Sequence, residues 1–338
     1  MISNALKTLF HPFEAGLLPM PAAAANALFL GAEPGFQVPD GFNADLSLVQ
    51  GFRPDFLALQ REGHHVLAAA DGDRYAAALV LCGRHRGRNE LDVAEALTRV
   101  QDGGLVLVAG GKDDGIASLA KRLGKLVALD GQAPKHHGLA FWFRAGDDRE
   151  AVAAALRRLN PPVCIDGRFE TVPGMFSHGR IDPGSKLLAE ALPVNLSGNT
   201  ADFCAGWGYL SAELVARCRD VASVDLYEAD YQSLEAARRN LPDMNAAPQF
   251  FWRDLLAEPI EPRYDAIVMN PPFHQGRAAE PGIGSKLIAV AAKTLKSRGS
   301  LYLVANKGLP YERDLARLFS EYRQAASDKA FNIFIARR

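Results

Sequence analysis

The feature that most constrains the fold of this chain is an internal repeat, in which three strand-like runs recur in the same order. The runs of the first half are residues 74–88, 105–109 and 139–143, and their counterparts are residues 263–277, 301–305 and 331–335. The offsets between the paired runs are 189, 196 and 192 positions. Chance explains one such match more easily than three at a nearly constant offset, so we expect two halves of the same architecture.

Short apolar runs alternate with helix-period segments in each half, which is typical of parallel strands joined by crossover helices. We therefore expect an α/β protein with two tandem Rossmann-like domains, each a doubly wound and mostly parallel sheet. A length of 338 residues with 48% hydrophobic side chains also fits two domains. Prolines and glycines then divide the chain into a first domain over 1–160, a linker over 161–174 and a second domain over 175–338.

The second half contains a predicted helix from about Pro183 and six strand-like runs. These runs are residues 200–204, 222–227, 249–252, 265–269, 301–305 and 330–335. The polar and glycine residues at the ends of these runs are the candidates for function, because ligands of open α/β sheets bind at the carboxyl ends of the strands.

Composition excludes several classes of protein. The formal net charge is −1, with a pI near 6.7, so any contact with nucleic acid must be a local patch. The four cysteines are dispersed and the histidines lack metal-ligand spacing, which favours the reduced cytoplasm and no metal site. No apolar run approaches the roughly 18 residues that span a bilayer, so we expect no membrane insertion.

A glycine turn follows the strand over 200–204 and leads into a helical segment over 210–217. Gly206 and Gly208 in this turn allow the backbone to approach a ligand closely, with helix-start N–H groups pointing at it. Asp202, on the strand just before the turn, is placed to orient a ligand ammonium group or to support the turn.

Two carboxylates follow the next two strands. Glu228 ends the strand over 222–227, twenty residues after Gly208, and an acid at this place accepts hydrogen bonds from ribose hydroxyls. Asp225 competes with Glu228, but strand-end placement favours Glu228. Asp254 follows the strand over 249–252 and is placed to receive an adenine amino group.

The most specific motif is Asn270-Pro271-Pro272-Phe273, directly after the strand over 265–269. The prolines fix the backbone and remove two donors, which leaves carbonyl groups as acceptors. The side-chain oxygen of Asn270 and the carbonyl of Pro271 then accept both protons of an exocyclic amino group and orient its nitrogen for direct methyl transfer. Phe273 is expected to stack on the base, which must be single-stranded or flipped out, and His274 lies beside it.

These residues resemble the class I methyltransferases, and more narrowly the bacterial ribosomal RNA guanine-N2 methyltransferases of the RsmC and RlmG type. The resemblance covers both halves. It depends on three groups of residues, which are Phe176, Ser177, Arg180, Asp182, Gly184 and Ser185; Asn270 to His274; and Val304 to Lys307 with Leu309 to Tyr311.

The resemblance implies transfer of a methyl group from S-adenosylmethionine to N2 of a guanine in ribosomal RNA, most simply of the small subunit. It implies that the first domain is degenerate and serves as scaffold or RNA-docking surface, since Leu81-Cys82-Gly83-Arg84 stands where the second half has Asn-Pro-Pro-Phe. Asn270, Pro271 and Phe273 would hold the guanine. The cofactor would be bound by Asp182, Gly184, Ser185, Asp202, Gly206, Gly208, Glu228 and Asp254.

One residue departs from the family pattern. Cys204 stands where the pattern usually has the first of three glycines, and the bulky Trp207 lies between the remaining two. Cofactor geometry and affinity are therefore open at this stage.

A basic cluster in the first half, Arg84, Arg86 and Arg88, is a candidate for phosphate contacts, as is His274 for contact with the substrate. The expected partner is ribosomal RNA or the small ribosomal subunit. The sequence leaves open which guanine is modified, whether free RNA or the assembled subunit is the substrate, and the oligomeric state.

Three other functions are consistent with parts of the pattern. An amino methyltransferase acting on DNA adenine or on a protein glutamine would use a similar Asn-Pro-Pro loop. A nicotinamide-dependent oxidoreductase would use the glycine turn and the acid twenty residues later, but it leaves residues 270–273 unexplained. A non-catalytic RNA-binding module would have a decayed cofactor pocket marked by Cys204 and Trp207.

Overall fold

The computed structural model describes residues 3–23, 25–242, 246–261, 263–272, 274–275, 278–279 and 281–338. The chain divides into two compact units. The first unit comprises Met1–Pro162 with Val172–Gly174, and the second comprises Val163–Thr171 with Met175–Arg338.

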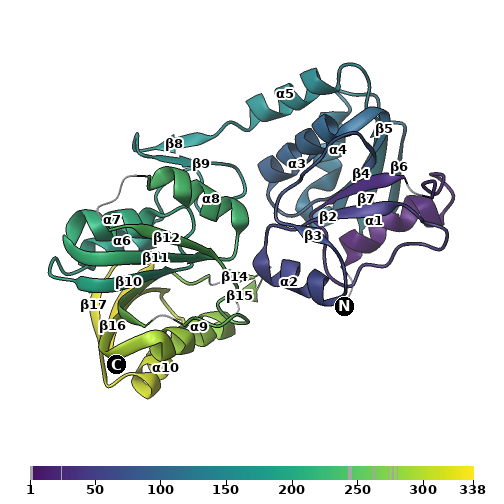
Figure 1. Ribbon diagram of the computed structural model, residues 1–338. Coiled ribbons are helices and arrows are strands. Elements are labelled where there is room, and N and C mark those ends of the chain that lie inside the picture. Colours follow the sequence, from purple (N-terminus) through teal and green to yellow (C-terminus); the bar gives the residue numbers. More distant parts are fainter. Residues whose placement is uncertain are drawn as a thin grey trace. The chain divides into compact units, whose positions relative to one another are not determined.

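The first unit is a seven-stranded sheet with helices packed on it (Figure 1). Its strands are β1 (Asn26–Leu30), β2 (Asp45–Val49), β3 (Val66–Leu67), β4 (Tyr75–Leu81), β5 (Val100–Gly111), β6 (Gly131–Lys135) and β7 (Gly138–Arg144). Its helices are α1 (Asn4–Glu14), α2 (Arg53–Arg61), α3 (Arg86–Arg99), the 3-10 helix η1 (Lys112–Asp114), α4 (Ile116–Leu123) and α5 (Arg149–Leu159). The strand order across the sheet is β3-β2-β1-β4-β5-β7-β6.

The second unit repeats this plan. Its main strands are β10 (Ser197–Phe203), β11 (Asp220–Glu228), β12 (Pro248–Trp252), β13 (Tyr264–Met269), β16 (Leu295–Asn306), β17 (Glu321–Ser327) and β18 (Phe331–Arg337). Its helices are α6 (Pro183–Ala191), α7 (Tyr209–Arg217), α8 (Tyr231–Asn240), α9 (Pro281–Thr294) and α10 (Tyr311–Leu318). Two hairpins complete it, β8 (Val163–Ile165) with β9 (Phe169–Thr171) and β14 (His274–Gln275) with β15 (Ala278–Ala279).

The two sheets have the same strand order, since β12-β11-β10-β13-β16-β18-β17 matches the order of the first unit position by position. The three runs of the sequence repeat are β4 and β13, β5 and β16, and β7 and β18. Both sheets carry a register shift at the same place, between Tyr75 and Ala77 in β4 and between Tyr264 and Ala266 in β13. Among the described strands of the two sheets, only the pairs made by β7 and by β18 are antiparallel and the other pairs are parallel, which confirms the predicted fold class.

Helices cover both faces of each sheet, and successive side chains of the central strands point alternately to the two faces. Phe29 of β1 packs edge-on against Phe10 of α1, whereas Leu28 and Leu30 lie in the core that includes residues of α3, α4 and α5. In the second unit Phe203 of β10 lies in the core with α9 and α10, whereas Asp202 points to α7. Strands buried on both faces have almost no polar side chains, so a buried Asp202 marks a special position.

Two features differ from the sequence-based expectation. Residues 161–174, expected to form the linker, contain the hairpin β8–β9, which clusters with the second unit. The edge strand β17 was not expected, because its side chains are largely exposed and show no apolar pattern. No helix in the part of the chain that the structure describes is long and apolar enough to cross a membrane.

Candidate active site

The glycine turn, residues 204–208, connects β10 to α7. Its backbone has positive φ at Cys204 (63°), Gly206 (55°) and Gly208 (92°), and Gly208 is the N-cap of α7. A Cβ added at Gly206 would meet no atom within 4 Å, so this side of the turn is open to a ligand. Gly208 is required for packing instead, since a Cβ there would lie 2.9 Å from the Leu241 side chain. The turn therefore offers open backbone at Gly206.

Cys204 occupies a left-handed position that favours glycine. An L-residue there costs roughly 1–2 kcal/mol relative to glycine. Burial raises the pKa of its thiol well above its ordinary value, with smaller contributions from the charges of Glu228 and Asp202, so the thiol is protonated at neutral pH. The residue that departs from the family pattern thus keeps the glycine-like backbone of the turn.

Asp202 is fully buried beneath the glycine turn. Its Oδ2 accepts a hydrogen bond of 2.8 Å from the Ser211 hydroxyl of α7, and its Oδ1 has no hydrogen-bond partner among the described residues. Burial raises the pKa of Asp202 to about 7, opposed by the Ser211 hydrogen bond and reinforced by the charge of Glu228. A buried carboxylate oxygen without a donor is costly, so Asp202 is a candidate to accept a hydrogen bond from a ligand.

Glu228 ties the end of β11 to the glycine turn. Its Oε2 accepts from the backbone N–H of Gly206, and its Oε1 accepts from those of Ala229 and Asp230, each at 2.8 Å. Burial is the largest effect on its pKa, which rises to about 7, while these backbone hydrogen bonds act in the opposite direction. Glu228 therefore holds the glycine turn in place and is also the acid at the end of the strand.

Asp254 lies in the turn after β12, where its Oδ1 accepts from the backbone N–H of Leu256 at 2.9 Å. Its own backbone N–H donates to Glu258 Oε2 at 2.9 Å. Asp254 is thus held in place at the carboxyl edge of the sheet, two strands from β10.

Asn270 follows β13 directly. Its Nδ2 donates to Asp182 Oδ2 at 3.1 Å and to Ser185 Oγ at 2.8 Å. Pro271 is buried and Pro272 is exposed. Phe273 lies outside the described residues, and the structure describes only the backbone placement of His274, in β14.

The start of α6 supplies the partners of Asn270. Asp182 is its N-cap and accepts from the backbone N–H of Ser185 at 2.8 Å. Gly184 has no room for a side chain, since a Cβ there would lie 2.9 Å from Phe331 of β18. Close packing on the sheet therefore fixes the position of this helix start.

One small cavity, the site cavity, joins these elements. It is lined by four of the predicted site residues, Asp182, Ser185, Gly206 and Asn270, together with Phe176, Ser177, Cys204, Ala205, Trp207, Tyr209 and Leu210. Asp202, Gly184, Gly208, Glu228, Asp254 and Pro271 are not among its lining residues. The structure thus brings together the glycine turn, the helix start of α6 and the Asn-Pro-Pro segment.

Sequence reasoning did not assign a role to three aromatic residues of this cavity. Trp207 is buried, donates from Nε1 to the carbonyl oxygen of Phe176 at 2.9 Å, and packs on Phe169 and Tyr209. Phe176 is 53% exposed at the cavity. Trp207 therefore packs into an aromatic cluster and anchors the segment that carries Phe176. The sequence contains one signal of this role, which is a bulky aromatic residue between two glycines.

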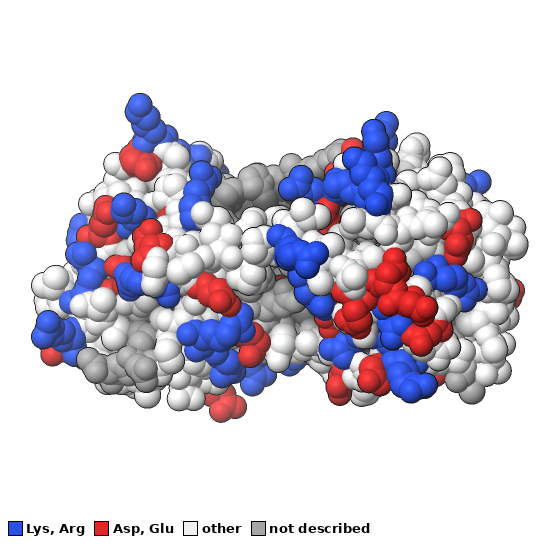
Figure 2. Space-filling view, turned by 90° about the horizontal axis from the view of Figure 1, so that it is seen from above, with Lys and Arg blue, Asp and Glu red and all other residues white. Residues whose placement is uncertain are grey.

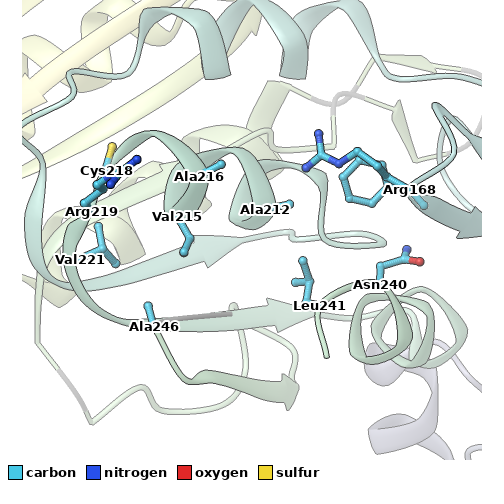
Figure 3. Close-up of a pocket in the computed structure, with 11 residues that line it drawn as sticks. Arg168, Ala212, Val215, Ala216, Cys218, Arg219, Val221, Asn240, Leu241 and Ala246 are labelled. Atoms are coloured by element: carbon cyan, nitrogen blue, oxygen red, sulfur yellow. The ribbon is translucent and has the colours of Figure 1, made fainter. Parts of the chain in front are cut away.

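A larger cavity of about 640 Å³ lies elsewhere in the second unit (Figure 3). It lies beside the C-terminal half of α7, with Arg168 and Asn240 at one end and Cys218 and Val221 at the other. None of the predicted site residues is among the described residues that line it. We therefore place the candidate site at the site cavity, where the polar groups converge.

The basic cluster of the first unit is divided by its contacts. Arg84 and Arg86 are exposed, in the loop after β4 and at the start of α3. Arg88 is half-buried and pairs with Asp92 of α3 at 2.8 Å. On the face seen in Figure 2, basic and acidic side chains are interspersed. The cluster therefore has two exposed cations rather than three.

Comparison with known proteins assigns the chain to a family. The family model for the methyltransferase small domain matches residues 166–335. Proteins named ribosomal RNA small subunit methyltransferase C are 34% identical in Pseudomonas paraeruginosa, over 78% of this chain and 80% of that protein, and 32% identical in Hahella chejuensis, over 73% and 72%. The match to the Chromohalobacter salexigens protein of the same name is 39% identical but spans half of each chain.

The solved structures agree on the fold. The chain is similar to a structure described as Thermus thermophilus 16S rRNA N2 G1207 methyltransferase (RsmC) in complex with AdoMet and guanosine, with a TM-score of 0.77, 22% identity, and coverage of 99% of this chain and 92% of that one. Both units therefore take part in the similarity. The chain belongs to the ribosomal RNA small subunit methyltransferase C family of S-adenosylmethionine-dependent methyltransferases.

Proposed function

We propose that this protein transfers a methyl group from S-adenosylmethionine to the exocyclic N2 of a guanine in the 16S RNA of the small ribosomal subunit. The observation that carries the proposal is the Asn270 side chain. Its nitrogen is occupied by Asp182 and Ser185, and the same cavity contains the open backbone of the glycine turn. An amide oxygen beside a cofactor turn is suited to orient an amino group for methyl transfer.

The residues present fit the cofactor. The unpartnered Oδ1 of Asp202 is a buried acceptor in need of a donor, which the ammonium group of S-adenosylmethionine supplies. Gly206 is open on its ligand side, and Glu228 Oε2, which accepts from the Gly206 N–H, keeps acceptor capacity for a ribose hydroxyl. Asp182, Gly184, Ser185, Gly208 and Asp254 complete the proposed cofactor set. When bound, the cofactor supplies an electrophilic methyl group.

The chain's own residues orient the acceptor. Asn270 Oδ1 and the Pro271 carbonyl oxygen accept the two protons of the guanine amino group, which directs the nitrogen lone pair toward the methyl donor. Pro272 holds the loop in one backbone conformation and donates no hydrogen bond. Phe273 provides the stacking surface for the base, and His274 contacts the substrate beside it. In this proposal catalysis is mainly positioning.

The choice of ribosomal RNA as substrate is supported by the relatives. The Pseudomonas and Hahella proteins, each aligned over more than two thirds of its length, are named for the small ribosomal subunit, and the Thermus structure is described as containing guanosine. The first unit would act as a scaffold or as a docking surface for the RNA, with Arg84 and Arg86 at phosphates.

Methyl transfer from labelled S-adenosylmethionine to undermethylated ribosomal RNA and small subunits tests the proposal, with the wild type and Asn270→Ala compared. We expect label in N2-methylguanosine, and its loss in the variant. Label only in DNA adenine or protein glutamine would favour the nearest alternative. Cofactor binding by calorimetry without transfer to any of these substrates would contradict the proposed reaction, and absence of cofactor binding would favour a scaffold.

A further inference from the structure

The side-chain amide of Asn270 has only one orientation that its neighbours accept. Its Nδ2 lies 3.1 Å from Asp182 Oδ2 and 2.8 Å from Ser185 Oγ. An ionised carboxylate only accepts hydrogen bonds, so the nitrogen of the amide must face Asp182. A flipped amide would bring its oxygen against the carboxylate. The oxygen Oδ1 is therefore directed away from α6.

The two acceptors are fixed before any substrate arrives. Asp182 Oδ2 also accepts from the backbone N–H of Ser185 at 2.8 Å, as the N-cap of α6. Ser185 is 7% exposed, and Gly184 between them packs against Phe331. The pair is thus part of a packed helix start, while Asn270 comes from the end of β13.

We propose that Asp182 and Ser185 are positioning residues that hold the Asn270 amide with Oδ1 toward the substrate, and so select an amino group as the methyl acceptor. This inference rests on the proposed function. In the flipped orientation the amide NH2 would face the substrate NH2, and neither group accepts a hydrogen bond. The two residues act on the substrate only through Asn270.

The hydroxyl of Ser185 is tested by Ser185→Ala. The matched control is Ser223→Ala. Ser223 Oγ also bonds the side chain of an asparagine, Asn199, at 3.3 Å, but this pair lies near the starts of β11 and β10, away from the carboxyl ends of the strands. We expect kcat to fall roughly five- to tenfold in Ser185→Ala, as for the loss of one hydrogen bond, and not in the control. A rise in the KM for S-adenosylmethionine with unchanged kcat would instead assign Ser185 to the cofactor alone and overturn the proposal. Equal kcat values in the two variants would overturn the proposal.

The carboxylate of Asp182 is tested through Asn270→Asp. This variant places a second carboxyl group against Asp182, and two such groups share one proton. The shared proton keeps one oxygen of residue 270 toward the substrate, whereas full ionisation drives the two groups apart. Activity relative to wild type should therefore fall as pH rises from 6 to 8.

The double variant Asp182→Asn with Asn270→Asp is the control. Asparagine caps a helix about as well as aspartate, so a role of Asp182 limited to capping predicts the same pH profile for the single and double variants. We expect the fall in activity to disappear in the double variant, and parallel profiles would overturn the proposal. Cys204 and Tyr209 also line the cavity, but burial raises their pKa values, that of Tyr209 to about 12, out of this range.

A second readout separates this inference from the proposed function. The raised pKa of the carboxyl pair makes Asn270→Asp lose stability as pH rises, because its folded state retains a proton that the unfolded state releases. Thermal unfolding should show this loss in Asn270→Asp and not in the double variant. Asp202 and Glu228 are common to both variants, so their titration cancels in the comparison. Matching thermal profiles would reject the inference even if the wild type methylates no guanine.

Discussion

The carboxyl ends of the parallel strands, where the second unit has its candidate site, have the same backbone arrangement in both units but different side chains. Equivalent strand registers place Phe29 where the second unit has Asp202, and Gln50 where it has Glu228. The sequence repeat places Leu81 opposite Asn270. The first unit therefore lacks both carboxylates and the amide.

A side chain nevertheless holds the corresponding turn of the first unit in place. Gln50 donates from Nε2 to the carbonyl of Ala32 and accepts at Oε1 from the backbone N–H of Phe52, each at 2.8 Å. Glu228 makes the corresponding contacts to backbone N–H groups in the second unit. Holding the turn and binding a ligand are thus separable roles of this position, and an amide suffices for the first.

The largest contrast is expected between Asn270→Ala and Leu81→Ala. Loss of the acceptor should lower kcat by at least about 100-fold, the usual cost of misplacing a reacting group, with cofactor affinity nearly unchanged. Leu81 is 6% exposed, so its truncation should cost roughly 2–5 kcal/mol of stability and leave the kcat of the folded protein unchanged. Methyl-transfer kinetics and denaturant unfolding measure the two effects. A comparable fall in kcat for both variants would remove the functional distinction between the units.

Asp202→Asn should change the pH dependence of cofactor binding and of stability. Burial raises the folded-state pKa of Asp202 to about 7, above its ordinary value near 3.8, so its contribution to stability is present below about pH 4 and is lost as pH rises to about 7. Ionised Asp202 attracts the cofactor ammonium, so wild-type affinity should rise on the order of tenfold from pH 6 to 8. Calorimetry across this range should show a flatter dependence in Asp202→Asn. A matching dependence would assign the titration to Glu228.

The left-handed position after the first central strand gives a smaller contrast. Gly31 has φ 74°, and a Cβ there would lie 2.8 Å from the Leu81 carbonyl oxygen, whereas the equivalent Cys204 already carries a Cβ at φ 63°. Gly31→Ala should cost about 2 kcal/mol or more, and Cys204→Ala within about 1 kcal/mol. Unfolding of both variants in urea measures this. Similar losses at the two positions would show that the turns are not equivalent.

The smallest effect is expected in RNA binding. Arg84→Ala with Arg86→Ala should weaken binding modestly and lower the slope of log affinity against log salt by at most about 2, one for each phosphate contact. Arg88→Ala should leave the slope unchanged, because Arg88 pairs with Asp92. Titrations of ribosomal RNA at several salt concentrations measure the slopes of these variants and of the wild type. An unchanged slope in the double variant would reject RNA docking at this loop.

Much of this architecture was predictable from the residues. The repeat placed β4, β5 and β7 against β13, β16 and β18, because a central strand is an apolar run that leaves a clear pattern. It missed β17, whose largely exposed side chains leave no such pattern, and the hairpin β8–β9, whose strands have only three residues each. Strand-end residues were found for a similar reason, since a polar or glycine residue stands out after an apolar run.

The sequence by itself determined two α/β halves, the functional half, and the residue types that meet at its edge. Only the tertiary structure decided that Asp202 has an unpartnered oxygen, that Trp207 points into an aromatic cluster, and that Asp182 and Ser185 orient Asn270. The physical reason is that periodicity reports which residues are buried within one element. Hydrogen-bond partners 88 and 85 positions apart become neighbours only when helix and strand pack together.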